Sequence, residues 1–131
     1  MTLTNNKSTA LEFLTALSSG QVAEHLFSDG FQPWTITSGP SAREVYIHGL
    51  HMLLSLFNNG MHHDIVSITA EGRTVVVESK GSGELKNGDT YKNLYVFIFT
   101  IETGKISAVS EYFDPQPVIE KIMPLMNIPK S

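Results

Sequence analysis

The chain has 131 residues and a mass of 14.4 kDa, the size of one domain, so we expect a single hydrophobic core. Nine Lys and Arg residues against thirteen Asp and Glu residues give a net charge of −4, and the scattered basic residues argue against a nucleic-acid partner. The absence of Cys excludes disulfides, thiolate zinc sites and a Cys nucleophile.

Apolar side chains in the first half of the chain recur mainly at helical spacing. Ser8 can cap a first helix that ends at Gly20, and a second short helix is expected over residues 21–27. Residues 31–37 have the composition of a short strand. A capping-box pattern of Ser41 and Glu44 then predicts the longest helix, which ends near Phe57.

From residue 62 onward, apolar and polar residues alternate between regularly spaced turn signals. This pattern predicts four consecutive antiparallel strands, with Gly81 and Gly83 as candidates for bends, and a final helical turn over residues 118–123. Helices followed by a strand meander indicate an α+β domain with helices on one face of the sheet. The four strands span residues 63–70, 73–83, 90–101 and 105–113.

The third of these strands is apolar on both of its faces. Asn93, Tyr95 and Phe97 share one face, whereas Leu94 and Val96 share the other. Helices can cover only one face of the sheet, and an exposed apolar face costs about 25 cal/mol per Å². We therefore expect a homodimer formed through the outer face.

The sequence gives no sign of contact with a membrane. The longest unbroken apolar run, residues 94–99, is too short to cross a bilayer. The first residues also lack the basic and then apolar layout of a signal peptide. The sequence thus predicts a cytoplasmic protein with no membrane partner.

The order of elements and the segment YKNLYVFIFTIETGKISAVSEYFD resemble the SnoaL-like group of the nuclear transport factor 2-like superfamily. The most specific pattern comprises Tyr91, Asn93 and Tyr95, the Gly104-Lys105-Ile106 turn, and Glu111, Tyr112 and Asp114. The resemblance implies one domain over residues 1–131, with a cystatin-like cone in which a curved antiparallel sheet wraps a long helix around an internal pocket. Such proteins include polyketide cyclases, a ketosteroid isomerase, epoxide hydrolases and dehydratases.

The chain departs from two of these enzyme types at their functional positions. The isomerase type has a carboxylate base just after the Trp-bearing strand, but no carboxylate lies between Asp29 and Glu44 here. The epoxide hydrolase type matches at Glu111, yet its partner Arg and Asp would fall near Ser79 and Gly81. The resemblance therefore implies the fold more strongly than either activity.

Two carboxylates are candidate catalytic groups. Glu111 alternates with Val109 and Phe113, so it is expected on an apolar face, where desolvation favours the neutral acid and suits proton transfer. Glu78 interrupts a run of valines and could share a cavity with Glu111 as one half of an acid and base pair. A solvent-facing position is the open alternative for each. Asp114 is expected to cap the turn that follows the last strand.

Several side chains are candidate ligand-binding groups. Asn93 and Tyr95 could orient a carbonyl or enolate oxygen, or could simply form hydrogen bonds across the sheet. Trp34 and Tyr46 could form an aromatic wall, or could belong to the core. The remaining expected pocket residues are Met52 and Leu56 on the long helix and Phe113 on the last strand.

The motifs of metal, nucleotide and serine-hydrolase sites do not occur. The five histidines lack HExxH spacing, and a partly buried, hydrogen-bonded role is favoured for His48 or His51 over a place in the cavity. We therefore predict a pocket for a small, largely hydrophobic molecule, with no cofactor and no metal. Its function is either cofactor-free proton transfer, as in isomerisation, cyclisation or dehydration of a carbonyl compound, or binding without turnover.

Overall fold

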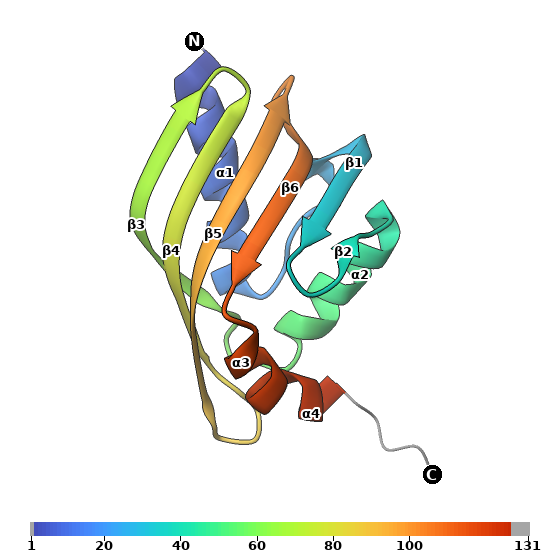
Figure 1. Cartoon of the computed structure of the whole chain (residues 1–131), viewed down its shortest axis with the longest axis vertical. Coiled ribbons are helices and arrows are strands. Elements are labelled where there is room, and N and C mark those ends of the chain that lie inside the picture. The colour runs from blue at the N-terminus through green and yellow to red at the C-terminus, as the bar shows by residue number, and fades with distance from the viewer. Residues whose placement is uncertain (1, 127–131) are drawn as a thin grey trace.

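One curved sheet of six strands forms the body of the protein, which we analyse as a computed structural model describing residues 2–126 (Figure 1). The strand order is β2-β1-β6-β5-β4-β3. The expected meander is confirmed, with antiparallel pairing of each strand to the next. Its strands are β3 (His62–Glu71), β4 (Thr74–Glu84), β5 (Thr90–Glu102) and β6 (Lys105–Phe113).

The Trp-bearing strand extends the sheet beyond β6. This strand, β1 (Phe27–Thr35), begins earlier than predicted and lies parallel to β6, with Thr35 opposite Glu111. The two-residue strand β2 (Gly39–Pro40) pairs with its end. The short helix that was expected ahead of this strand is only a 3₁₀ turn, η1 (Glu24–Leu26), because Phe27 already belongs to the strand.

Two helices lie on the concave side of the sheet, and the first of them is the longer. Helix α1 (Thr2–Ser19) has 18 residues, whereas α2 (Arg43–Leu54) has 12, so the prediction that the second would be longest is wrong. The predicted capping box is also wrong, because Ala42 is the N-cap of α2 and no side chain caps it. The backbone N–H of Ser41 instead binds the carbonyl of Pro33.

Alternation along the strands separates a buried concave face from an outer face. On β5 the side chains at positions 91, 93, 95, 97, 99 and 101 are all buried, as the sequence pattern predicted for this face. Phe13 of α1 makes edge contacts with Phe97 and Phe99, with ring centroids 6.0 and 5.6 Å apart. Leu94 on the opposite face is 64% exposed. The core therefore lies between α1 and the concave face.

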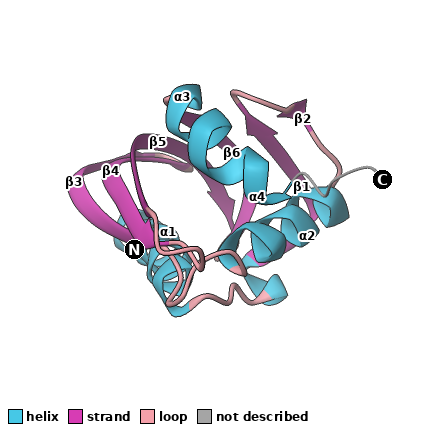
Figure 2. Ribbon diagram, turned by 90° about the horizontal axis from the view of Figure 1, so that it is seen from below, coloured by secondary structure: helices cyan, strands magenta, loops and turns pink. Residues whose placement is uncertain are grey.

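The end of the described chain folds back over the concave side. It comprises α3 (Pro115–Pro117), the π-helical turn η2 (Val118–Ile122) and α4 (Met123–Met126). Asp114 begins this segment as predicted, since its carboxylate accepts a hydrogen bond from the backbone of Gln116 at 3.0 Å. Seen from below, the sheet bends into an arc, with α2 and α4 at its open side (Figure 2). No helix within residues 2–126 is long and apolar enough to span a membrane.

Candidate functional site

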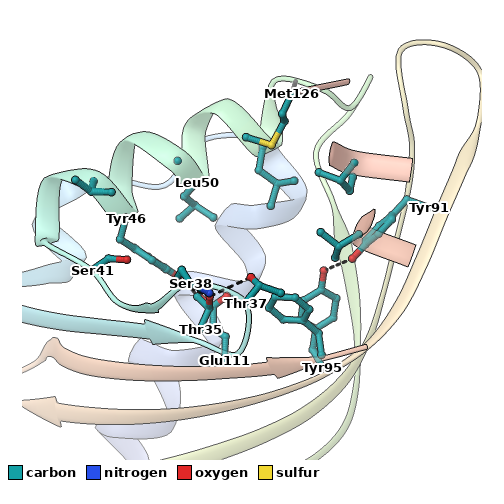
Figure 3. A pocket seen from close by; sticks show the side chains of 16 residues that line it. Thr35, Thr37, Ser38, Ser41, Tyr46, Leu50, Tyr91, Tyr95, Glu111 and Met126 are labelled. Atoms are coloured by element: carbon teal, nitrogen blue, oxygen red, sulfur yellow. Dashed lines mark hydrogen bonds between the residues drawn. The ribbon is translucent and has the colours of Figure 1, made fainter. Parts of the chain in front are cut away.

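A cavity of about 340 Å³ lies between α2, the concave face of the sheet and the C-terminal segment (Figure 3). This volume falls within the range of about 300–1,000 Å³ that is usual for small-molecule pockets. Its walls are largely apolar, with a few hydroxyl groups and one carboxylate. The lining residues are Thr35, Thr37, Ser38, Ser41, Val45, Tyr46, Gly49, Leu50, Leu53, Tyr91, Tyr95, Glu111, Phe113, Val118, Ile122 and Met126.

Among the described residues that line the cavity, only Glu111 carries a carboxylate. Its strand register places it between Phe97 and Thr35 on the concave face. The hydroxyl of Tyr46, which reaches down from α2, donates a hydrogen bond to the Glu111 carboxylate. Burial raises the pKa of Glu111 to about 7, although the Tyr46 hydrogen bond opposes the rise by stabilising the charged form. Glu111 can therefore both take and give a proton near neutral pH.

A second polar group lies beside the first on the same face. The hydroxyls of Tyr91 and Tyr95 are 2.7 Å apart, and Asn93 donates an amide hydrogen bond of 2.8 Å to the Tyr91 hydroxyl. Burial raises the pKa of both tyrosines, so each keeps its proton at neutral pH. Figure 3 shows the tyrosine pair and Glu111 on the same side of the cavity.

Hydroxyl side chains from the end of β1 and the loop after it form a third polar group. Thr35 and Ser38 lie 2.8 Å apart through their hydroxyl oxygens, and the backbone N–H of Ser38 also binds Thr35 at 3.0 Å. These hydroxyls are already bound to one another, so they form a polar border to the cavity near Glu111 (Figure 3). Thr37 and Ser41 complete this border.

Four of the predicted site residues line the cavity. Glu111, Tyr46, Tyr95 and Phe113 converge there from α2, β5 and β6. Phe113 lies directly opposite Tyr95 in the antiparallel register, and their ring centroids are 5.5 Å apart. The strand residues of this group share a face for two reasons. Side chains two positions apart along one strand point the same way, and so do side chains opposite each other on adjacent strands.

Two predicted site residues lie on the outer face of the sheet, so their expected place in the pocket is wrong. Glu78 is exposed and accepts a hydrogen bond from Ser67, because its position alternates with the inward Val77. Trp34 precedes the inward Thr35 and therefore packs against Tyr112 on the outside, with ring centroids 5.1 Å apart.

The helix contributes a different face from the predicted one. Met52 is 42% exposed, and Leu56 packs against the core beyond the end of α2, so neither lines the cavity. The predicted Tyr46 does line it, together with Leu50 and Leu53, which were not expected there. Their spacing of four and three residues is itself helical, and it could have identified this face.

Asn93 has the predicted inward orientation without reaching the cavity. Its amide is occupied by Tyr91 and by the backbone of Asp114. Tyr91 was not among the expected pocket residues, although its parity with Asn93 and Tyr95 on β5 places it on their face. The C-terminal contributors Val118, Ile122 and Met126 come from a segment whose path only the tertiary structure decides.

The histidines lie outside the cavity. His51 is partly buried and its ring nitrogen lies 3.1 Å from the carbonyl oxygen of Val22, as favoured for it, whereas His48 is exposed. His63, for which the sequence predicted no specific role, is buried, and its ring nitrogen lies 2.9 Å from the Ser79 hydroxyl oxygen. Among residues 2–126, no three His, Asp or Glu side chains gather as metal ligands would.

Comparison with known proteins shows the family to which the chain belongs. Residues 10–109 match the family described as SnoaL-like domain. The chain belongs to this SnoaL-like family. The match ends before Glu111, so family membership by itself assigns no role to that carboxylate. No curated protein matches the sequence.

Solved structures share the SnoaL-like fold at low sequence identity. An NTF2-like protein from Anabaena variabilis is 22% identical with a TM-score of 0.77, over 86% of this chain and 89% of that one. A putative SnoaL-like polyketide cyclase from Jannaschia is 19% identical with a TM-score of 0.76, over 99% and 97%. An LEH-like epoxide hydrolase from M. tuberculosis is 16% identical with a TM-score of 0.74, over 95% and 97%. These likenesses show the fold alone.

Proposed function

We propose that the cavity binds a small, largely hydrophobic carbonyl compound and that Glu111 moves a proton on it without a cofactor. The observation that carries this proposal is the Glu111 carboxylate in a largely apolar cavity, with burial raising its pKa to about 7. A general acid or base works best when its pKa lies near the working pH. Perturbed carboxyl groups in clefts are also typical of catalytic sites.

The reaction needs no group beyond the chain and its substrate. The Glu111 carboxylate takes a proton from the carbon next to a carbonyl, and the electron pair of the broken C–H bond forms an enolate. Glu111 then returns the proton to the same carbon or to another one, which gives exchange or isomerisation. In cyclisation the enolate carbon instead attacks a second carbonyl, and the resulting alkoxide takes the proton from Glu111. In dehydration the enolate expels a hydroxyl group from the next carbon, and that group takes the proton from Glu111 and leaves as water.

The test is deuterium exchange into small ketones, such as cyclohexanone and 2-tetralone, followed by NMR in D₂O. We expect the wild-type protein to accelerate exchange and Glu111→Gln to reduce the rate by about 10²- to 10⁴-fold. Glu78→Gln is the matched control, because that carboxylate is exposed on the outer face. Equal exchange by wild type and Glu111→Gln would overturn the proposal.

The competing function is ligand binding or protein interaction without turnover. It is favoured by the lack of a carboxylate between Asp29 and Glu44 and by the presence of Ser79 and Gly81 where the epoxide hydrolase type has its partner groups. In that case ketones bind in the cavity, and neither the wild-type protein nor the Glu111 variant exceeds the exchange rate of buffer.

We also propose that the protein is a homodimer joined through the outer face of its sheet. Leu94 and Val66 are 64% and 52% exposed there, and the rings of Trp34 and Tyr112 lie beside each other on the same face. Covering this apolar surface with a second copy removes it from water, which is favourable by about 25 cal/mol per Å².

A further inference from the structure

The hydrogen bonds of Asn93 fix the direction in which its side chain donates. Its Oδ1 accepts from the backbone N–H of Asp114 at 3.1 Å, and its Nδ2 donates to the Asp114 carbonyl at 2.8 Å. Rotating the amide by half a turn would place its N–H group against the Asp114 N–H and its oxygen against the Asp114 carbonyl oxygen. Only one orientation therefore forms both hydrogen bonds with the backbone. In that orientation Nδ2 also donates to the Tyr91 hydroxyl oxygen at 2.8 Å.

The hydroxyl groups of Tyr91 and Tyr95 together have one proton that no hydrogen bond among the described residues uses. Tyr91 and Tyr95 carry two hydroxyl protons between them, and only one proton can lie between their oxygens, which are 2.7 Å apart. Asn93 supplies a donor to Tyr91 and no acceptor. The two hydroxyls have no other hydrogen-bond acceptor among the residues that the structure describes. One tyrosine proton is therefore left for whatever occupies the cavity.

We propose that the Tyr91 and Tyr95 pair, oriented by Asn93, is a binding site for the carbonyl oxygen of a neutral ligand. This proposal deepens the proposed function, because it names the group that would hold the substrate oxygen while Glu111 acts on the neighbouring carbon. Tyr95 and Glu111 are diagonal neighbours on adjacent strands, since Tyr95 lies opposite Phe113. Such neighbours have Cβ atoms about 7 Å apart, and both side chains line the cavity.

The charge of the cavity selects against anions. None of the described residues that line it is Lys, Arg or His, so a ligand carboxylate or phosphate would meet no cation there. The raised pKa of each tyrosine keeps both hydroxyls protonated at neutral pH, and an oxyanion formed during enolisation would accept the spare proton's hydrogen bond more strongly than the ketone does.

Three naphthalenes of similar size test the site by calorimetry: 2-acetylnaphthalene, 2-ethylnaphthalene and 2-naphthoate. We expect the ketone to bind about three- to tenfold more tightly than the hydrocarbon, as a net hydrogen bond allows, and the carboxylate to bind most weakly. The double variant Tyr91→Phe/Tyr95→Phe should lose the preference for the ketone. Tyr112→Phe on the outer face is the matched control and should keep it. An unchanged preference in the double variant, or tight binding of the carboxylate, would overturn the site.

Asn93→Asp tests the orientation without removing either tyrosine. Once ionised, the carboxylate accepts the Tyr91 proton, so the Tyr95 proton is used on Tyr91 and none is left for the ligand. The ¹³C shift of a labelled 2-acetylnaphthalene carbonyl should move downfield when the wild-type protein binds it, and should move back in Asn93→Asp. An unchanged shift contradicts the proton count. Glu111→Gln should leave the shift in place, so loss of exchange and loss of carbonyl binding are separable results.

Discussion

The hydroxyl of Tyr46 donates to the carboxylate of Glu111 across 65 positions of sequence, joining helix α2 to the last strand of the sheet. Both groups face the cavity, and this hydrogen bond lowers the pKa of Glu111 against the effect of burial. The balance between these two effects decides how much of the carboxylate is ionised at neutral pH.

Removing the Tyr46 hydroxyl should raise the pKa of Glu111 above about 7. Tyr46→Phe keeps the ring contacts with Phe27 and Phe31 but deletes the donor that stabilises the charged form. A hydrogen bond to a charged group contributes about 1.5–3 kcal/mol, so we expect a rise of about one pH unit or more. Titration of the Glu111 carboxyl ¹³C signal, assigned with Glu111→Gln, measures it. A lower value in the variant would contradict this account.

Acid should destabilise the protein through His63. Burial lowers the pKa of His63 to about 4 from its ordinary 6.5, so the unfolded chain binds a proton more readily than the folded one. The stabilisation that neutral His63 contributes is complete above pH 6.5. It is lost as the pH falls toward 4, at a cost on the order of 3 kcal/mol in the free energy of unfolding. Denaturant unfolding of wild type and His63→Gln should show this as a pH-dependent difference.

Gly81→Ala should disturb the wall of the cavity. A methyl group there would lie 2.8 Å from a ring carbon of Tyr95 and 3.0 Å from one of His63, closer than packed carbons approach. We expect a loss of about 1–3 kcal/mol in the free energy of unfolding, with displacement of the Tyr95 ring. Gly30→Ala meets nothing within 4 Å and should change stability little. Equal stability of the two variants would show that the Tyr95 ring yields freely.

A charge on the outer face should separate the proposed dimer. Val96→Asp places a carboxylate in the apolar interface, where its desolvation is unfavourable. Sedimentation at micromolar concentration should give twice the chain mass for the wild type and the chain mass for the variant. Asn87→Asp adds the same charge in the exposed turn between β4 and β5 and should remain dimeric. A wild-type monomer would rule out the dimer.

The sequence by itself determined which residues of each strand share a face. Alternation in β5 and β6 placed Tyr95, Glu111 and Phe113 together on the inner face, because side chains on a strand repeat every two residues. The same alternation places Tyr91 on the inner face of β5. It places Glu78 and Trp34 on the outer face once the strand register shows which residues of β4 and β1 point inward. The family resemblance added the curvature of the sheet and the position of the pocket.

Only the tertiary structure decided what lies opposite those faces. The parallel pairing of β1 with β6, the turn of α2 that brings Tyr46 to Glu111, and the return of Val118 and Ile122 over the cavity are contacts between distant segments. Local propensity does not encode them, because they depend on how helices pack against a curved sheet. The raised pKa of Glu111 belongs to the same level, since it comes from burial that the strand pattern alone does not measure.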